Sequence, residues 1–434
     1  MIVPAEIQRL IDDLTDARAR TLDLATGLDG AQLTGPRLDI VNPILWEIGH
    51  VAWFHEYFVL RRCDGGEPRL GDADSLYDSS TVGHDTRWDL PLPSLADTLD
   101  YLDRVRQALL NRLITRPVDA EAVALTQLAI FHEDMHGEAL TYTRQTLGYP
   151  PPGFTTAADA DIEGETGPWP GDATIAGGTF LLGSPPGTSF VFDNEKWAHP
   201  VTIAPFRMAR APVTNAEFLQ FVTDGGYERA RFWDTEGWSW RNAAGARHPA
   251  YWSPRDGGWS ERWFDRQVPL RPHRPVHHIN WYEARAWCRW AGRRLPTEAE
   301  WEAAAATVPA STGGFSPRKR RYPWGNGAPD PNHANLDGTA LGAVDVSAHA
   351  AGDSAWGCRQ MLGNVWEWTA NSFQPYPGFA PDAYADYSAP WFGTRKVLRG
   401  GSWVTRGRLI SNTYRNFFTP ERRDVPAGLR TCAL

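Results

Sequence analysis

Two histidines stand four residues apart in the segment 131–138, which reads FHEDMHGE. Side chains four residues apart lie on the same face of a helix, so the imidazoles of His132 and His136 can bind one cation together. A third histidine, His50, lies upstream in the segment 46–53, WEIGHVAW. Three imidazoles on one side of a metal ion leave its remaining coordination positions open, which is typical of catalytic rather than structural metal sites.

Each of these histidines lies on an apolar stripe with helical spacing. A histidine pair with this spacing also occurs without a metal, as ordinary surface or core side chains, so the stripes decide the interpretation. Buried imidazoles without a partner are unfavourable, and a shared metal removes that penalty. We therefore predict a metal site formed by His50, His132 and His136. The stripes consist of Leu125, Leu128, Ala129, His132, His136, Ala139 and Thr143, and of Trp46, His50, Trp53, Tyr57 and Leu60.

Length, charge and composition limit the classes to which the protein can belong. A chain of 434 residues usually forms two domains. A net charge of -9 argues against nucleic acid as a partner. No apolar run approaches the ~18 residues that span a membrane, and the N-terminus does not resemble a signal peptide. The cysteines, Cys63, Cys288, Cys358 and Cys432, lack any CxxC spacing and read as reduced thiols. We expect a soluble, cytoplasmic protein, most simply a monomer.

The first 150 residues have a helical pattern. Periodic segments cover residues 4–24, 42–62, 94–113 and 119–147, and Gly148 and Pro150 end the last of them. Asn42 precedes Pro43, a pair that predicts an N-cap followed by a proline in the first turn. Helices of this length predict an antiparallel four-helix bundle over residues 1–150, with the metal site between facing helices.

Residues 151–434 have a different residue pattern from the first 150. Residues 151–177 are polar and carry no periodicity, so they are predicted to be a linker. Residues 178–434 are predicted to form the second domain. In it, short β-type runs at 178–183 and 201–203 alternate with helical segments at 214–222, 281–292 and 297–305 and with loops rich in Trp, Gly and Pro.

Five motifs of the second domain occur in a recognisable order: PVTNAEF at 212–218, PVHHINW at 275–281, RLPTEAEWE at 294–302, GNVWEW at 363–368 and LRGGSW at 398–403. The series resembles the formylglycine-generating-enzyme fold, a C-type-lectin-like α+β domain. The N-terminal bundle resembles the DinB-like fold. Together they resemble the non-heme iron sulfoxide synthases of ergothioneine biosynthesis, which join sulfur to C2 of the histidine betaine hercynine.

The resemblance implies Fe(II) as cofactor, with hercynine and O2 as small-molecule substrates. It places the iron ligands on His50, His132 and His136, and the active site between the two domains. It also places hercynine on Asn416, Phe417 and Phe418, in the segment RNFFTPERR at 415–423. An aromatic face suits a trimethylammonium group. Phe417 and Phe418 can equally be core residues. The family's tyrosine proton donor falls on Tyr376, with Tyr384 and Tyr387 as nearby alternatives.

The sulfur or selenium donor is expected to contact the loop 77–91, YDSSTVGHDTRWDLP, through Ser79, Ser80, His84 and Arg87. An acidic thiol peptide needs a bidentate arginine clamp, and this loop offers a single arginine. The loop therefore favours a neutral, polyhydroxylated donor. This feature, with the ending GLRTCAL, resembles the selenoneine-synthase branch, whose donor is a selenosugar. The alternative is an ergothioneine-type enzyme that uses γ-glutamylcysteine or cysteine.

The sequence also fits other functions. The segment HEDMH also fits the HExxH pattern of zinc hydrolases, in which Glu133 would be the general base. The third ligand of such an enzyme normally follows the pair, whereas His50 precedes it. A lectin-like domain can also be a non-catalytic binding module, although three inward histidines argue against that. A formylglycine-type oxidase is disfavoured because Cys288, Cys358 and Cys432 lack close pairing.

Overall fold

The computed structural model describes residues 3–154 and 166–434, in two compact units that comprise Met1–Thr155 and Thr156–Leu434. We call them the N-terminal and the C-terminal unit and describe each by itself. Residues 155–165, in the middle of the predicted linker, lie outside the described residues.

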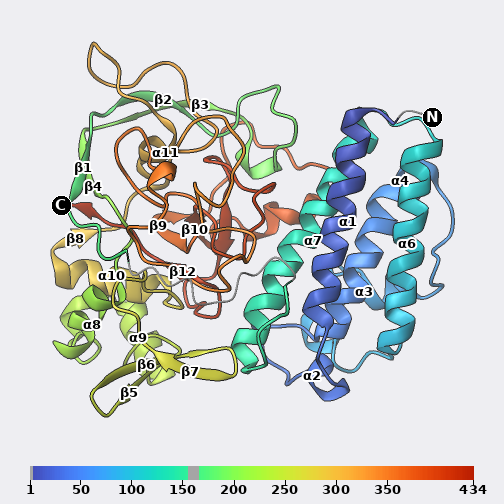
Figure 1. Cartoon of the computed structure of the whole chain (residues 1–434), viewed down its shortest axis with the longest axis horizontal. Helices are drawn as coiled ribbons and strands as arrows, with labels where there is room; N and C mark the ends of the chain where they lie inside the picture. Colours follow the sequence, from blue (N-terminus) through green and yellow to red (C-terminus); the bar gives the residue numbers. More distant parts are fainter. Residues whose placement is uncertain (1–2, 155–165) are drawn as a thin grey trace. The chain divides into compact units, whose positions relative to one another are not determined.

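The N-terminal unit is a bundle in which the long helices run side by side (Figure 1). These are α1 (Ala5–Ala25), α3 (Ile44–His55), α6 (Leu95–Thr115) and α7 (Ala120–Leu147). The predicted helical bundle is therefore confirmed. Shorter segments join them: α2 (Gly30–Thr34), the π-helix η1 (Glu56–Arg61), α4 (Arg62–Asp64), α5 (Ala73–Tyr77) and the 3-10 turn η2 (His84–Thr86).

Local sequence explains where these helices begin and end. The Ser94 side chain accepts a hydrogen bond from Asp97 N, and the Asp119 side chain accepts one from Ala122 N, so both act as N-caps. Gly148 ends α7 in the left-handed conformation that glycine adopts readily. The predicted N-cap at Asn42 is wrong. Pro43 occupies that position without a side-chain cap, and the Asn42 amide has another partner.

The core of the N-terminal unit lies between α1, α3, α6 and α7. Its aliphatic and aromatic side chains are almost fully buried, and each contributes about 1.5–3 kcal/mol through removal from water. Because α3 and α7 both border this core, the side chains on their inner faces meet inside the bundle. Fully buried core residues include Leu14, Leu24, Ile48, Val51, Phe54, Val59, Val105 and Leu109.

The C-terminal unit contains short sheets. One has the strand order β1-β4-β13-β8, and a second has the order β11-β10-β9-β12, in which β12 and β9 pair in parallel. β2 pairs with β3, and β5, β6 and β7 form a meander. The strands are β1 (Asp172–Ile175), β2 (Gly178–Leu182), β3 (His199–Ile203), β4 (Phe206–Ala209), β5 (Trp252–Arg255), β6 (Gly258–Trp263), β7 (Arg266–Pro269), β8 (Arg293–Arg294), β9 (Trp366–Ser372), β10 (Lys396–Arg399), β11 (Asn416–Phe418), β12 (Ala427–Gly428) and β13 (Cys432–Ala433).

The helices of this unit are α8 (Asn215–Thr223), α9 (Thr235–Ala244), α10 (Trp281–Ala291) and α11 (Glu298–Ala306). Of these, α10 and α11 pack against strands, and α8 and α9 pack against α10. Capping boxes at Thr214, Asn280 and Thr297 begin α8, α10 and α11. The fold is α+β, as predicted. Strand β1 lies within the range 151–177 that was predicted to be a linker, because its residues pair with β4.

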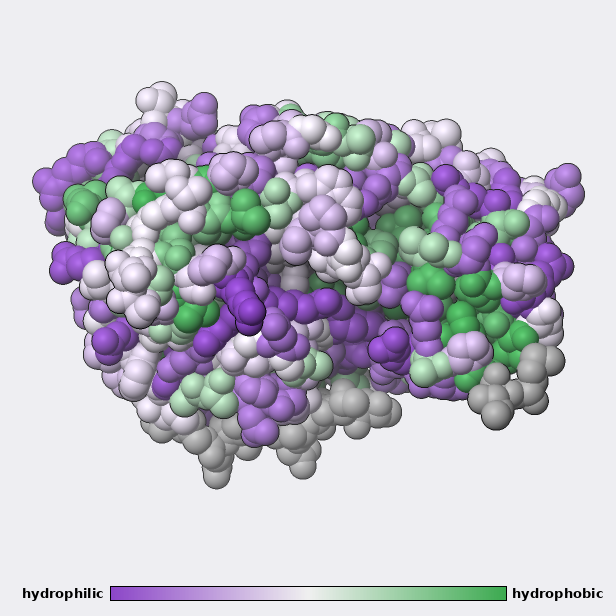
Figure 2. Space-filling view, turned by 90° about the horizontal axis from the view of Figure 1, so that it is seen from above, coloured by the Kyte–Doolittle hydropathy of each residue, from purple (hydrophilic) through white to green (hydrophobic). Residues whose placement is uncertain are grey.

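The surface mixes polar and apolar residues. Figure 2 shows hydrophilic, intermediate and hydrophobic side chains interspersed on the visible face. Within the part of the chain that the structure describes, no helix is both long enough and apolar enough to span a bilayer.

Candidate functional site

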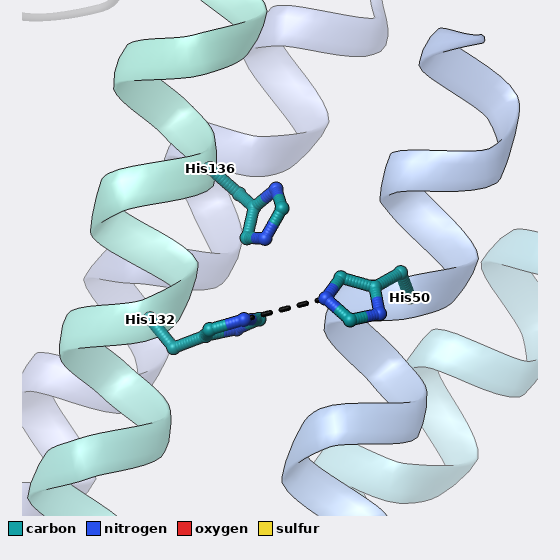
Figure 3. Close-up of side chains that lie close together, drawn as sticks. All are labelled: His50, His132 and His136. Carbon is teal, nitrogen blue, oxygen red and sulfur yellow. Dashed lines mark hydrogen bonds between the residues drawn. The ribbon is translucent and has the colours of Figure 1, made fainter. Parts of the chain in front are cut away.

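The three predicted histidines meet inside the N-terminal bundle. His50 comes from α3, and His132 and His136 come from successive turns of α7 (Figure 3). One ring nitrogen from each lies within 4.8 Å of the others, and His50 Nε2 is 3.3 Å from His132 Nε2. Among the described residues this is the one group of three or more His, Cys, Asp or Glu side chains with the spacing of a metal site.

A hydrogen bond at Nδ1 of His50 leaves Nε2 as the ring nitrogen that faces the site. Its Nδ1 lies 2.7 Å from the Tyr77 carbonyl oxygen. A carbonyl only accepts hydrogen bonds, so Nδ1 carries the proton and Nε2 keeps its lone pair. Gly49 permits this contact, because a Cβ at that position would lie 2.2 Å from the Tyr77 ring. Trp46 stacks on the His50 ring with centroids 4.8 Å apart and planes 9° apart.

His132 lies deeper in the bundle. The Phe54 ring stacks on it with centroids 3.5 Å apart and planes 9° apart. Burial, followed by the neighbouring His136, lowers the pKa of both His50 and His132 well below the usual histidine value. Both imidazoles are therefore neutral at physiological pH, which is the form that binds metals.

His136 is the most exposed of the three and faces a buried carboxylate. Its Nδ1 lies 3.4 Å from Glu47 Oε2, and Glu47 is 3% exposed. A metal-binding histidine usually donates its second N–H to such a carboxylate. In His50 and His136 the ring nitrogen Nδ1, which points away from the site, has a hydrogen-bond partner. The three imidazoles together fit a divalent transition metal with open coordination positions. The site thus fits the predicted iron.

Glu133, the candidate general base of a zinc hydrolase, lies outside this site. Its carboxylate accepts a 2.9 Å hydrogen bond from Arg18 Nε and a 2.7 Å hydrogen bond from Thr21 Oγ1, and it lies 2.9 Å from His55 Nε2. Burial alone would raise the pKa of Glu133, but Arg18 and His55 hold it well below the usual glutamate value. A carboxylate held in an ion pair is a weak general base, so this geometry argues against the zinc-hydrolase alternative.

The predicted donor loop holds its four candidate residues in different surroundings. Ser79 is partly buried, Ser80 is exposed and bonded to Asp78, and His84 Nε2 lies 2.8 Å from the Val41 carbonyl oxygen. Arg87 is 9% exposed. Its Nη1 donates a 2.7 Å hydrogen bond to Asn42 Oδ1, and its guanidinium lies 3.9 Å from the centre of the Trp46 ring.

The predicted hercynine residues form strand β11 of the C-terminal unit. Asn416, Phe417 and Phe418 are all partly buried. Phe417 stacks on Phe373, with ring centroids 4.0 Å apart, and the Arg422 guanidinium lies 5.1 Å from the centre of the Phe418 ring. Phe417 and Phe418 therefore combine packing with partial exposure.

The tyrosine candidates differ in their contacts. Tyr376 is 7% exposed, and its hydroxyl donates a 3.2 Å hydrogen bond to Glu298 Oε1. Burial raises its pKa well above the usual tyrosine value. Tyr387 and Tyr384 lie side by side, and the Tyr387 ring centroid is 5.9 Å from that of Phe417.

Sequence reasoning did not single out Glu47, which lies next to His136, or Asn42, which donates a hydrogen bond to Glu47. Glu47 is three residues before His50 and so lies near its helix face, a weak signal for a charged residue in an apolar stripe. Asn42 was interpreted as a cap, because Asn before Pro is a common helix start.

Comparisons with known proteins agree with this architecture. The DinB superfamily profile matches residues 13–140, and that of the sulfatase-modifying factor enzyme 1-like domain matches residues 158–433. The chain thus joins a DinB-type bundle to a formylglycine-generating-enzyme-like domain. It is 39% identical to hercynine oxygenase from Mycolicibacterium thermoresistibile, over 98% of this chain and 94% of that protein.

A second hercynine oxygenase, from Mycobacterium tuberculosis, is also 39% identical, over 98% of both chains. A formylglycine-generating enzyme from Thermomonospora curvata is 30% identical over 61% of this chain and 93% of that protein. The chain belongs to the hercynine oxygenase family, and it is an oxidoreductase.

Proposed function

We propose that the protein is an O2-dependent, non-heme Fe(II) enzyme that forms a bond between C2 of the hercynine imidazole and the sulfur or selenium of a donor. The observation that carries the proposal is the convergence of three imidazoles inside the bundle of a chain that belongs to the hercynine oxygenase family. An unactivated ring carbon needs oxidation before such a bond can form, and Fe(II) with O2 supplies that redox chemistry.

The chain's own residues would position the reactants. His50, His132 and His136 would hold Fe(II) and leave positions open for substrates. Phe54, stacked on His132, and Trp46, stacked on His50, shield the imidazoles from water and fix their rotation. Such rigid placement is how a binding site turns a reaction between separate molecules into one between neighbours.

Hercynine would bind to Asn416, Phe417 and Phe418. A trimethylammonium group carries a charge but no N–H, so aromatic faces bind it without an unsatisfied donor. The partial exposure of all three residues supports this role.

For the donor we propose a selenosugar, with γ-glutamylcysteine or cysteine as the alternative. Ser79, Ser80 and His84 are polar and at least partly accessible. The guanidinium of Arg87 is directed to Asn42 and Trp46, which supports a donor without carboxylates that require a clamp.

A tyrosine would deliver a proton to reduced oxygen. Tyr376 is the residue that the motif resemblance selects, and Tyr387 has the contact with Phe417. The variants Tyr376→Phe and Tyr387→Phe distinguish the two candidates. Removing the hydroxyl of the proton donor should change the product or slow turnover, whereas removing the hydroxyl of the other tyrosine should do neither.

The deciding experiment is aerobic incubation of the Fe(II)-loaded protein with hercynine and either donor, followed by mass spectrometry. A product with sulfur or selenium on the hercynine ring is the expected result. Failure to consume hercynine with any of these donors would refute the proposal.

A further inference from the structure

A chain of hydrogen bonds leads from Arg87 through Asn42 and Glu47 to His136. Arg87 Nη1 donates to Asn42 Oδ1 at 2.7 Å, and Asn42 Nδ2 donates to Glu47 Oε1 at 2.8 Å. Glu47 Oε2 lies 3.4 Å from His136 Nδ1. Arg87 and Glu47 are 9% and 3% exposed, so water competes little for these groups.

The chemistry of Arg87 fixes which atoms of Asn42 donate and which accept in this series of hydrogen bonds. A guanidinium has donors and no acceptor, so Asn42 must turn its oxygen to Arg87 and its NH2 to Glu47. Glu47, as a carboxylate, only accepts, and His136 Nδ1 must therefore carry the proton. His136 Nε2 is then left with the lone pair that a metal requires.

Arg87 also supports a second imidazole. Its guanidinium lies over the Trp46 ring, and Trp46 stacks on His50. Trp46 Nε1 donates a 2.8 Å hydrogen bond to the Leu76 carbonyl, next to the Tyr77 carbonyl that accepts from His50. One arginine of the loop thus supports both histidine positions, His50 by packing and His136 by hydrogen bonds.

We propose that Arg87, Asn42 and Glu47 are positioning residues of the metal site: Glu47 sets the tautomer of His136, and Asn42 and Arg87 hold the Glu47 carboxylate in place. This inference rests on the proposed metal function and deepens it. It also gives Arg87 a role at the metal instead of the predicted contact with the donor.

The first test needs no substitution. Nitrogen-15 NMR of the metal-free wild-type protein distinguishes the two neutral tautomers of His136, assigned by the signals missing in His136→Gln. The expected form carries the proton on Nδ1. A proton on Nε2 would overturn the inference.

The second test measures Co(II) affinity and its absorption spectrum under anaerobic conditions. In Glu47→Gln, the oxygen of the introduced amide faces the Asn42 NH2, so the NH2 of that amide faces His136 Nδ1. His136 must then carry its proton on Nε2, and affinity should fall about 10–100-fold.

Two matched controls accompany this variant. Glu56→Gln changes a buried glutamate bonded to Tyr101 and Arg69, and Arg112→Met changes a buried arginine paired with Asp64. Both substitutions disturb a buried charge in the same bundle without touching the chain that leads to His136. Both proteins should bind Co(II) like the wild type.

A double variant tests the direction itself. Without Arg87, Asn42 can rotate its amide, and the amide introduced by Glu47→Gln can then turn its oxygen to His136. In the wild-type background Arg87→Met should weaken Co(II) binding, because it removes the guanidinium that lies over Trp46 and holds Asn42. In Glu47→Gln the same substitution should partly restore Co(II) binding. A purely structural role would make the two losses add.

The outcomes separate this inference from the proposed function. A wild-type protein that binds no Co(II) would refute the metal site itself. A wild type that binds Co(II), with Glu47→Gln equally tight and His136 in the same tautomer, would overturn only the positioning role.

Discussion

Arg399 Nη2 donates a 2.6 Å hydrogen bond to Glu302 Oε2, and both side chains are fully buried. Arg399 belongs to the motif LRGGSW on β10, and Glu302 to the motif RLPTEAEWE on α11. Trp301 of the same helix donates to Glu367 of the motif GNVWEW. Three of the five motifs thus bond to one another and hold α11 on its sheet.

Replacing Glu302 with Gln should destabilise the protein by about 3–5 kcal/mol at pH 7, because it leaves a buried guanidinium partly unpaired. Burial alone would raise the pKa of Glu302, but Lys319 and Arg399 hold it below the usual value. Its stabilisation is therefore present above the unfolded pKa of about 4.3 and is lost as the pH falls through the lower folded value. Urea unfolding monitored by tryptophan fluorescence measures the free energy of unfolding of both proteins.

Below about pH 5 the stability of Glu302→Gln should depend less on pH than that of the wild type. Glu236→Gln, at an exposed position, is the control and should unfold like the wild type. Equal stability of both variants at pH 7 would contradict this account.

The sequence was sufficient for much of the architecture. Periodicity located α1, α6 and α7 to within a few residues, because amphipathic helices and capping residues are local signals. Strand β1 was missed because it has only four residues in an otherwise polar segment, and its pairing with β4 depends on residues elsewhere in the chain.

The site was predictable only in part. His132 and His136 follow from spacing on one helix, and His50 from a second apolar stripe. Glu47 and Asn42 could not be found, because their roles depend on how α3 faces α7 and on where the loop places Arg87. Hydrogen bonds between distant side chains leave no periodic trace in the sequence.

Replacing Glu133 with Gln should lower stability while metal binding persists. The substitution breaks the buried pair with Arg18, and we expect a loss of about 3–5 kcal/mol. Thermal unfolding and metal content measure the two effects. Glu121→Gln, on the exposed side of the same helix, should match the wild type in both. Loss of turnover with unchanged stability would instead indicate a general base.

Replacing His136 with Ala should abolish stoichiometric Fe(II) binding, because two imidazoles remain on a site built for three. Metal analysis after anaerobic loading and desalting measures this. His333→Ala, which removes a histidine paired with Asp330 in the C-terminal unit, should retain full metal content. A His136→Ala protein with wild-type iron and activity would refute the ligand assignment.

Replacing Phe417 with Leu should raise the KM for hercynine about 5–30-fold and leave the KM for the donor unchanged. This corresponds to loss of about 1–2 kcal/mol of cation–π attraction. Because Phe417 also stacks on Phe373, Phe417→Tyr is needed as a variant that keeps the ring, and it should restore hercynine affinity. A Leu variant with unchanged KM would assign Phe417 to packing alone.

The proposed donor preference rests on the loop between Tyr77 and Pro91. Its one arginine is buried against Asn42 and Trp46, so an acidic thiol peptide lacks the bidentate clamp that contributes about 2–5 kcal/mol to such recognition. We expect kcat/KM for a selenosugar to exceed that for γ-glutamylcysteine by more than about tenfold, the factor that 1.4 kcal/mol represents.

His84→Ala should weaken donor use and leave hercynine affinity unchanged, whereas Thr81→Ala, in the same loop, should affect neither. Competition of the two donors for one pool of hercynine, with products quantified by mass spectrometry, decides the question. A clear preference for the peptide would assign the protein to the sulfur-using branch and show that its carboxylates are bound by residues outside this loop.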